Sequence, residues 1–285
     1  MLRKATIAAA SLVLALSLTG TAMAAGKPEQ PLAPKGGWTF EGPLGKFDQA
    51  QLQRGFKVYR EVCASCHAMS MLSYRNLGEK HGPFYDPEHP NPNDNPYVKA
   101  IAAEVQITDI DSETGDEVQR PGTSADRFAS PFKNEAAARA SNGGAMPPDL
   151  SVISKARTAG PSYISSLMQG YSAPPAGLIV PAGQDYNRFM PGDLSASWTG
   201  DHDHVPHGGF IAMPPPLAPN KVTFDDGTPS TVRQQSHDVA AFLAWAAEPK
   251  QTERKQTGLA VMLYLLLLTV LVYVSYRRVW RNESH

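Results

Sequence analysis

The spacing of apolar residues along the chain predicts one helix that leads into residue 63 and another that ends near residue 247. In the first, apolar side chains recur every three or four residues, as on one face of a helix, at Leu52, Phe56, Tyr59 and Val62. Asp48 precedes this stripe and can cap the first turn through its carboxylate. In the second, over about 230–247, the same spacing places apolar residues on one side, and Pro249 ends the helix.

Four shorter helices are predicted between these two, each near residues that favour a helix N-terminus. Asn95-Pro96, Asn134 and Asp149 supply caps for three of them, and the fourth follows a break at Gly160-Pro161. Their expected ranges are 95–105, 134–140, 149–156 and 162–169. No run of alternating residues is long enough to predict a large sheet, and 25 prolines and 23 glycines indicate many ordered loops. The predicted fold class is therefore mainly α with long loops.

Two apolar runs differ from these amphipathic patterns, and the first is predicted to be a cleaved export signal. Arg3 and Lys4 precede an uncharged run over 5–18, and Ala22 and Ala24 are the small residues that a signal peptidase reads. The run is too short and wrongly flanked for a permanent membrane span. We therefore expect residues 1–24 to be a signal peptide that is removed from the mature chain.

The second apolar run is predicted to be a single transmembrane anchor. Residues 258–276 form 19 consecutive positions without a charge, which is enough for a helix to cross a hydrocarbon core of about 30 Å. The arginines that follow favour a cytoplasmic C-terminus, Arg277, Arg278 and Arg281. The expected division is an extracytoplasmic domain over 25–256, an anchor in the lipid bilayer over 257–277 and a cytoplasmic tail over 278–285. A buried core helix is the alternative, although such helices seldom lack charges for this long.

The charge of the chain gives two expectations about partners. The formal net charge is −1, which offers no strongly basic surface for nucleic acid. The domain over 25–256 is mildly acidic, and six carboxylates without a base fall in one segment, Glu104, Asp109, Asp111, Glu113, Asp116 and Glu117. Most such runs are solvated surface, but an acidic face can also attract a basic soluble protein.

The pentapeptide Cys63-Ala64-Ser65-Cys66-His67 carries the most specific chemistry in the chain. Two thiols three residues apart, followed at once by an imidazole, match the attachment site of haem c. Each thiol can form a thioether to the haem, and His67 is then the proximal iron ligand. These are the only two cysteines of the chain, so a zinc site would lack a second pair of thiolates. A redox-active dithiol is the remaining alternative.

An electron-transfer haem usually has Met or His as its second axial ligand, and the sequence offers several methionines. Met146 and Met213 both lie in the tetrapeptide Ala-Met-Pro-Pro, whose prolines would hold the sulfur rigidly at the iron. Met190, in Phe189-Met190-Pro191, is a weaker third candidate. Because spacing does not distinguish Met146 from Met213, both stay open at this point.

A second candidate metal site lies in Asp201-His202-Asp203-His204 together with His207. These side chains are ligand types for transition metals, but a glycine-rich loop can equally leave them solvated. No nucleophile with a neighbouring base, phosphate-binding loop or pair of carboxylates can be recognised, so the sequence assigns no catalytic residue.

Several segments between about residue 40 and the anchor resemble the cytochrome c1 family. They are Arg54-Gly55-Phe56-Lys57-Val58-Tyr59 before Cys63, Glu135-Ala136-Ala137-Ala138-Arg139, Pro147-Pro148-Asp149-Leu150-Ser151, Met213-Pro214-Pro215, Phe224-Asp225-Asp226-Gly227-Thr228-Pro229 and Phe242-Leu243-Ala244-Trp245-Ala246-Ala247-Glu248-Pro249. Because these independent motifs occur in the right order, chance similarity is improbable.

The resemblance implies a c-type cytochrome domain and a haem c subunit of the cytochrome bc1 complex, a quinol:cytochrome c oxidoreductase. In that family the methionine of the later motif binds iron, so the resemblance selects Met213 as the sixth ligand opposite His67. Arg139 matches an arginine that approaches a haem propionate, a pairing that suits a guanidinium and a carboxylate. The extra cysteines that some bacterial members join in a disulfide have no counterpart here.

The function that the resemblance implies is electron transfer, with no enzymatic activity of the subunit alone. It would accept one electron from the Rieske iron–sulfur protein and pass it to a soluble c-type cytochrome, in a respiratory or photosynthetic chain. Its haem domain would lie in the periplasm, anchored in a bacterial inner membrane, while cytochrome b and the Rieske subunit carry out the quinol chemistry. The rival interpretation is a membrane-anchored haem enzyme or gas-binding sensor with an open axial position.

Overall fold

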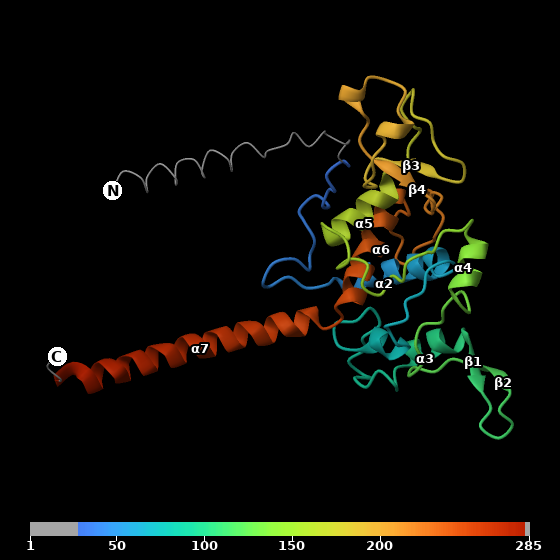
Figure 1. Ribbon diagram of the computed structural model, residues 1–285. Helices are drawn as coiled ribbons and strands as arrows, with labels where there is room; N and C mark the ends of the chain where they lie inside the picture. The colour runs from blue at the N-terminus through green and yellow to red at the C-terminus, as the bar shows by residue number, and fades with distance from the viewer. Residues whose placement is uncertain (1–27, 283–285) are drawn as a thin grey trace, which may run out of the picture.

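The computed structural model describes residues 28–282, and within them the chain is mainly helical, as the sequence predicts. The helices are α2 (Gln49–Val58), α3 (Pro96–Ala103), α4 (Glu135–Ser141), α5 (Gly160–Gln169), α6 (Val232–Ala247) and α7 (Gln251–Val279). α2 to α6 belong to a head, and α7 extends away from it as a single long helix (Figure 1). The predicted signal peptide over 1–24 lies outside the described residues.

The predicted helix caps are confirmed where the cap bonds to its own first turn. The side chains of Asp48, Asn95 and Asn134 accept hydrogen bonds from backbone N–H groups two or three residues later, at the starts of α2, α3 and α4. α5 begins at the Gly160-Pro161 pair that the sequence assigns to a break, since proline fits the first turn of a helix.

The predicted helix over 149–156 is wrong, because these residues form successive turns. The Asp149 carboxylate accepts hydrogen bonds from the N–H and Oγ of Ser70, 79 residues away, and from the N–H of Ser151. A carboxylate engaged with a distant segment and with its own turn does not cap a helix.

α6 lies between α2 and α5 and forms the centre of the head (Figure 1). The rings of Phe56 in α2 and Phe242 in α6 meet edge to face, with centroids 5.6 Å apart. At Gly55 an added Cβ would lie 2.1 Å from the carbonyl oxygen of Asp238, so only glycine permits this approach. Beside it, Arg54 forms an ion pair of 2.8 Å with Asp238, which is fully buried. These contacts fix α2, which leads into the cysteine motif, against the core.

The strands form two small antiparallel pairs and no large sheet among the described residues. β1 (Gln106–Ile110) pairs with β2 (Glu117–Pro121), and β3 (Asp185–Asn187) pairs with β4 (Gly209–Ile211). The β1–β2 hairpin, which the sequence did not predict, holds most of the acidic segment and projects from the edge of the head (Figure 1). β3 and β4 belong to residues 170–211, hereafter the lobe, which has a small apolar cluster of its own around Leu178, Tyr186 and Leu194.

α7 contains the apolar run that the sequence predicts to be the anchor. Within residues 28–282 it is the one helix long and apolar enough to cross a membrane, and its side chains over 258–276 are exposed. Its start is bound to the head, since Lys250 pairs with Glu79 at 2.9 Å and Arg254 pairs with Glu248. Thr252 in the first turn is buried. These features describe a single-pass membrane protein whose anchor begins against the head.

Candidate functional site

The cysteine motif follows a local change in helix geometry. α2 continues into a π-helical turn over Tyr59–Cys63, in which the N–H of Ala64 donates to the carbonyl of Tyr59 at 2.8 Å. Such turns are rare and often occur at functional sites. The chain then tightens, because the N–H groups of Cys66 and His67 both donate to the carbonyl of Cys63, at 3.1 and 2.9 Å. Two free thiols, of residues that are half-buried as a whole, and an imidazole are thereby gathered on one turn.

The hydrogen bond of His67 determines which of its nitrogens can bind a metal. Its Nδ1 lies 2.8 Å from the carbonyl oxygen of Pro148. Because a carbonyl can only accept, Nδ1 carries the hydrogen, and in the neutral ring Nε2 has a free lone pair. Burial lowers the pKa of His67, against the opposing effects of the Pro148 carbonyl and Asp149. A neutral imidazole with its second nitrogen fixed by a carbonyl is the usual form of a metal-binding histidine.

The residues that follow His67 are bound to the segment that follows Met146. We call residues 145–151, which include Met146 and this segment, the first Met loop. In addition to the His67 bond, the N–H of Leu150 donates to the Ala68 carbonyl at 2.8 Å and the N–H of Met71 donates to the hydroxyl of Ser151 at 3.0 Å. The first Met loop therefore lies along the Nδ1 side of the imidazole.

Asp149 strengthens the same connection between the two segments. Its Oδ2 accepts from the N–H and Oγ of Ser70 at 3.0 and 2.6 Å, and its Oδ1 accepts from the N–H of Ser151 at 2.7 Å. Burial alone would raise the pKa of Asp149, but these hydrogen bonds outweigh it and hold the pKa below its usual range. The carboxylate is thus charged at neutral pH and fixes the first Met loop behind His67.

Met213 lies in a second loop, residues 212–217, hereafter the second Met loop. It follows directly on β4, and the backbone carbonyl of Met213 accepts a hydrogen bond of 2.9 Å from the hydroxyl of Tyr171. The chain beyond it enters the main apolar core at Leu217 and Val222 and passes near the cysteine motif, since Lys221 acts electrostatically on Cys63. Burial raises the pKa of the Cys63 thiol to about 12, although the nearby charge of Lys221 opposes the rise.

The three methionine candidates thus have different surroundings. Met146 is 45 % exposed in the loop bonded to the Nδ1 side of His67. The sulfur of Met190 lies 3.7 Å from the hydroxyl of Tyr163, which donates to it. Met213 is half-buried, and only its backbone carbonyl has a hydrogen-bond partner in the described residues.

Arg139 is engaged with its own surroundings. Its guanidinium pairs with Glu135 one turn earlier at 2.7 Å and donates to the carbonyl of Gly144 at 3.1 Å. The side chain is about half exposed. Arg139 therefore borders the first Met loop, and its role toward a propionate remains a prediction.

The structure gives no support to a metal site in the lobe. Asp201 accepts from the N–H of Asp203 through one oxygen and pairs with Nδ1 of His204 at 2.7 Å through the other. Across residues 28–282, no group of three or more His, Cys, Asp or Glu side chains has an arrangement that could hold a metal ion. The side chains of the lobe candidates, residues 201–204 and 207, are exposed to solvent.

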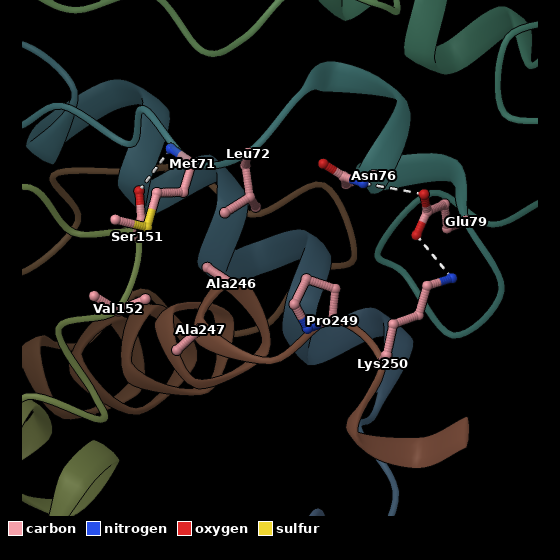
Figure 2. Close-up of a pocket in the computed structure, with 10 residues that line it drawn as sticks. All are labelled: Met71, Leu72, Asn76, Glu79, Ser151, Val152, Ala246, Ala247, Pro249 and Lys250. Carbon is pink, nitrogen blue, oxygen red and sulfur yellow. Dashed lines mark hydrogen bonds and ion pairs between the residues drawn. The ribbon is translucent and has the colours of Figure 1, made fainter. Parts of the chain in front are cut away.

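One open cavity of about 320 Å³ lies at the base of the head, beside the start of α7 (Figure 2). Its wall combines apolar side chains such as Met71 and Val152 with the ion pair between Glu79 and Lys250. None of Cys63, Cys66 and His67 lines it. The cavity is therefore separate from the cysteine motif and gives no information about haem binding.

Sequence reasoning missed two groups that fix the motif and its candidate ligand. One is the Pro148 carbonyl on His67, and the other is the Tyr171 hydroxyl on Met213. A backbone carbonyl has no signature in a sequence, and Tyr171 lies 42 residues from its partner. The donor set found here fits haem c, since two free thiols and an imidazole with a bare Nε2 share one turn.

Comparison with known proteins gives one consistent result. A family model described as the Cytochrome C1 family matches residues 38–283. Cytochrome c1 of Rhodospirillum rubrum is 41% identical over 251 residues, covering 87% of each chain. A mitochondrial cytochrome c1 heme protein of Arabidopsis thaliana is 42% identical over 246 residues, 86% of this chain and 71% of that protein. A Bradyrhizobium diazoefficiens protein named cytochrome b/c1 is 42% identical over 271 residues, and this chain spans only 36% of its length.

Proposed function

The chain belongs to the cytochrome c1 family, and on that premise we propose that it passes single electrons from the Rieske iron–sulfur protein to a soluble c-type cytochrome. Members of this family are haem-carrying electron-transfer subunits of the cytochrome bc1 complex, and this chain carries covalent haem c. Haem c supplies a carrier that holds one electron as its iron changes between the ferric and ferrous states. The subunit alone has no enzymatic role in this proposal.

The residues proposed to hold the haem are Cys63, Cys66, His67 and Met213. The two free thiols would form the thioethers, and the bare Nε2 of His67 would bind the iron. The observation that carries this proposal is the bond from Nδ1 of His67 to the Pro148 carbonyl, because it fixes the ring and its tautomer. It also places the first Met loop on the Nδ1 side, which supports Met213 and not Met146 as the ligand across the iron. Arg139 is proposed to approach a propionate.

We further propose the topology that the sequence predicts. Residues 1–24 would be a removed signal peptide and 25–256 a periplasmic haem domain, with 257–277 in the bacterial inner membrane and 278–285 in the cytoplasm. The exposed apolar surface of α7 over 258–276 supports the span, and the arginines at its end support the orientation. A protease added to intact spheroplasts should digest the head and leave the C-terminus protected.

Cytochrome b and the Rieske protein are the proposed partner subunits, which would carry out the quinol chemistry. The name of the Bradyrhizobium relative, cytochrome b/c1, supports the pairing with a cytochrome b. Solubilising the membrane in mild detergent and purifying this chain should recover both partners. Recovery of the chain alone, with its haem intact, would contradict membership of such an assembly.

The β1–β2 hairpin is the proposed docking region for a basic cytochrome c, although its charge is partly neutralised. Glu104 pairs with Arg60 at 2.9 Å, and Asp109 pairs with Arg120 at 2.6 Å. Within residues 28–282, neither Glu113 nor Asp116 forms an ion pair. Asp111 forms no ion pair in these residues either, but its carboxylate accepts from the N–H groups of Glu113 and Thr114 within the turn. Glu113 and Asp116 are therefore the two carboxylates of the turn that we expect to steer a partner.

Salt dependence tests this docking region. Glu113→Gln with Asp116→Asn should slow electron transfer to a basic cytochrome c at low ionic strength and flatten the dependence of the rate on salt. Glu41→Gln with Glu88→Gln removes the same charge elsewhere on the head and is the matched control. Equal effects of the two double variants would mean that the hairpin has no specific role in docking.

The absorption spectrum of the purified holoprotein tests the haem assignment against the rival gas-binding function. A ferric haem with a thioether ligand has a weak far-red band, and its ferrous form binds carbon monoxide only weakly and slowly, because the gas must first displace the sulfur. We expect both properties here, because a filled sixth position suits electron transfer. Rapid carbon monoxide binding without a far-red band would instead support the enzyme or sensor with an open axial position.

A further inference from the structure

Tyr171 makes an isolated contact with the backbone of the second Met loop. Its hydroxyl donates to the carbonyl of Met213 at 2.9 Å, across 42 residues of sequence. The ring is half-buried at the boundary between α5 and the lobe. Nothing in the local sequence of either residue predicts this pairing.

The backbone around Tyr171 is held in a fixed frame. Tyr171 forms an isolated antiparallel bridge with Asn187 of β3, and Asn187 is paired in turn with Gly209 of β4. β4 ends at Ile211, two residues before Met213. Tyr171 is therefore connected to Met213 in two ways: through the backbone pairing of β3 and β4, and directly through the hydrogen bond of its hydroxyl.

Asn187 connects this frame to the core of the head. It is fully buried, and its side chain donates to the Leu167 carbonyl in α5 at 2.7 Å and accepts from the N–H of Phe189 at 3.0 Å. α5 packs on α6 at the centre of the head. The backbone of Tyr171 is thus tied to the core through Asn187, independently of the loop that its hydroxyl contacts.

Apart from the packing of Leu217 in the core, the second Met loop has few groups near Met213 that can form backbone hydrogen bonds. Met213 is followed by three prolines, at 214, 215 and 216, and none of them has a backbone N–H. Three successive positions therefore supply no donor for a backbone hydrogen bond. An external donor to the Met213 carbonyl replaces what the loop lacks.

We propose that Tyr171 is a positioning residue for the sixth iron ligand. Its hydroxyl holds the backbone of Met213 so that the thioether would stay within reach of the iron, and this inference rests on the proposed function of Met213. The residue does not touch the iron. Losing its hydrogen bond increases the fraction of molecules in which the sulfur has left the metal.

The test is Tyr171→Phe in the full-length holoprotein, with carbon monoxide as the probe of an open position. The ring stays and the hydroxyl is lost, so an ordinary hydrogen bond disappears from the ligated state. We expect the apparent affinity of the ferrous haem for carbon monoxide to rise roughly five-fold, and the far-red band of the ferric form to weaken. Unchanged carbon monoxide affinity would overturn the proposal.

Tyr163→Phe is the matched control, because its hydroxyl lies 3.7 Å from another methionine sulfur, that of Met190. It should leave both readouts at the wild-type level. Equal changes in the two variants would overturn a specific role for Tyr171. A Tyr171→Leu variant separates hydroxyl from ring: if Leu alters the spectrum and Phe does not, ring packing holds the loop and the hydrogen bond does not.

Met213→Leu distinguishes failure of this inference from failure of the ligand assignment. Met213→Leu should abolish the far-red band entirely and open the haem to carbon monoxide. If Met213→Leu keeps the band, Met213 is not the ligand and the proposal for Tyr171 falls with it. If Met213→Leu loses the band and Tyr171→Phe is unchanged, only the positioning role is overturned.

Discussion

The two Met loops have the same four residues, Ala-Met-Pro-Pro, and opposite surroundings. The first is bonded to His67 through the Pro148 carbonyl and to the residues after His67 through the Leu150 amide and the Asp149 carboxylate. The second is fixed from outside, through the Tyr171 hydroxyl. The difference arises from the flanking residues, because 149–151 supply amides and a carboxylate whereas residue 216 is another proline. A short motif therefore acquires its role from the groups its neighbours can bond.

The largest expected effect is a fall in reduction potential when the sulfur of the second Met loop is removed, with no change when that of the first is removed. Met213→Leu keeps volume and apolarity, so the fold should lose less than about 1.5 kcal/mol, and the haem should stay attached through its thioethers. The reduction potential should fall by roughly 0.2 V, or about 4.6 kcal/mol, because a thioether favours ferrous iron. Potentiometric titration of both variants measures this, with Met146→Leu expected to be silent. Exchanged phenotypes would assign the ligand to the first Met loop.

The next largest difference between the two loops is expected in unfolding free energy, when a glycine that precedes each loop is replaced by alanine. Gly208 has φ +111°, and a Cβ there would lie 2.6 Å from the carbonyl oxygen of Asn187. Gly208→Ala should cost about 2–4 kcal/mol in unfolding free energy and weaken the far-red band, since strain adds to a clash with backbone. Gly144 has φ +91° with no atom within 4 Å of an added Cβ, so Gly144→Ala should cost only about 1 kcal/mol. Denaturant titration gives both values, and equal costs would contradict the crowded placement of β4.

Asp149→Ala should weaken the first Met loop without touching the second. The variant removes the acceptor of three hydrogen bonds, and we expect a loss of about 1–3 kcal/mol in denaturant unfolding with the far-red band retained. Exposed Asp203→Ala is the control, expected within about 0.5 kcal/mol of wild type. A lost band in Asp149→Ala would mean that the two loops are coupled.

The pH dependence of stability also tests the contribution of the Asp149 carboxylate to the first Met loop. The pKa of Asp149 is lowered in the folded state, so its stabilising effect is complete above an unfolded pKa of about 4 and is lost as the pH falls through the folded value. Asp149→Asn should therefore reduce the loss of stability between neutral and acidic pH. Melting temperatures between pH 3 and 7 measure it, and parallel curves for variant and wild type would refute it.

The smallest effect is expected at Arg139, which borders the first Met loop. Its ion pair with Glu135 is exposed, so Arg139→Gln should change stability by less than about 0.5 kcal/mol. If Arg139 approaches a propionate, losing its charge should lower the reduction potential by less than about 60 mV. Arg157→Gln, on an exposed turn, is the control. A potential equal in both variants would leave Arg139 as a helix-surface charge.

The sequence predicts those parts of the molecule that depend on local bonds. Asp48, Asn95 and Asn134 cap helices in the expected places because donor and acceptor lie within one turn. Asp149 has the same chemistry, but its donors include a distant serine, so the predicted helix is absent. The β1–β2 hairpin was missed although its tip contains Gly115 at φ +78°. Ile107 and Ile110 fall on opposite faces of β1, so the strand shows no alternation of apolar and polar residues.

The same division applies to the site. The Cys63-to-His67 motif is local and was found directly, whereas the choice between two identical tetrapeptides depended on family resemblance. Tyr171 and the Pro148 carbonyl act across 42 and 81 residues. No periodicity or motif connects such pairs, because they are brought together by the packing of α5, α6 and the lobe.

The join between head and anchor restricts how the molecule can move. Only three residues separate α6 from α7, and ion pairs of Lys250 and Arg254 brace the first turn of α7 against the head. These contacts restrain rotation of the head relative to the first turn of α7. Under the proposed function, the electron donor and the electron acceptor would therefore each have to move to a head whose position is restrained. Inserting a glycine-rich spacer after Pro249 should remove this restraint and let the head move relative to α7.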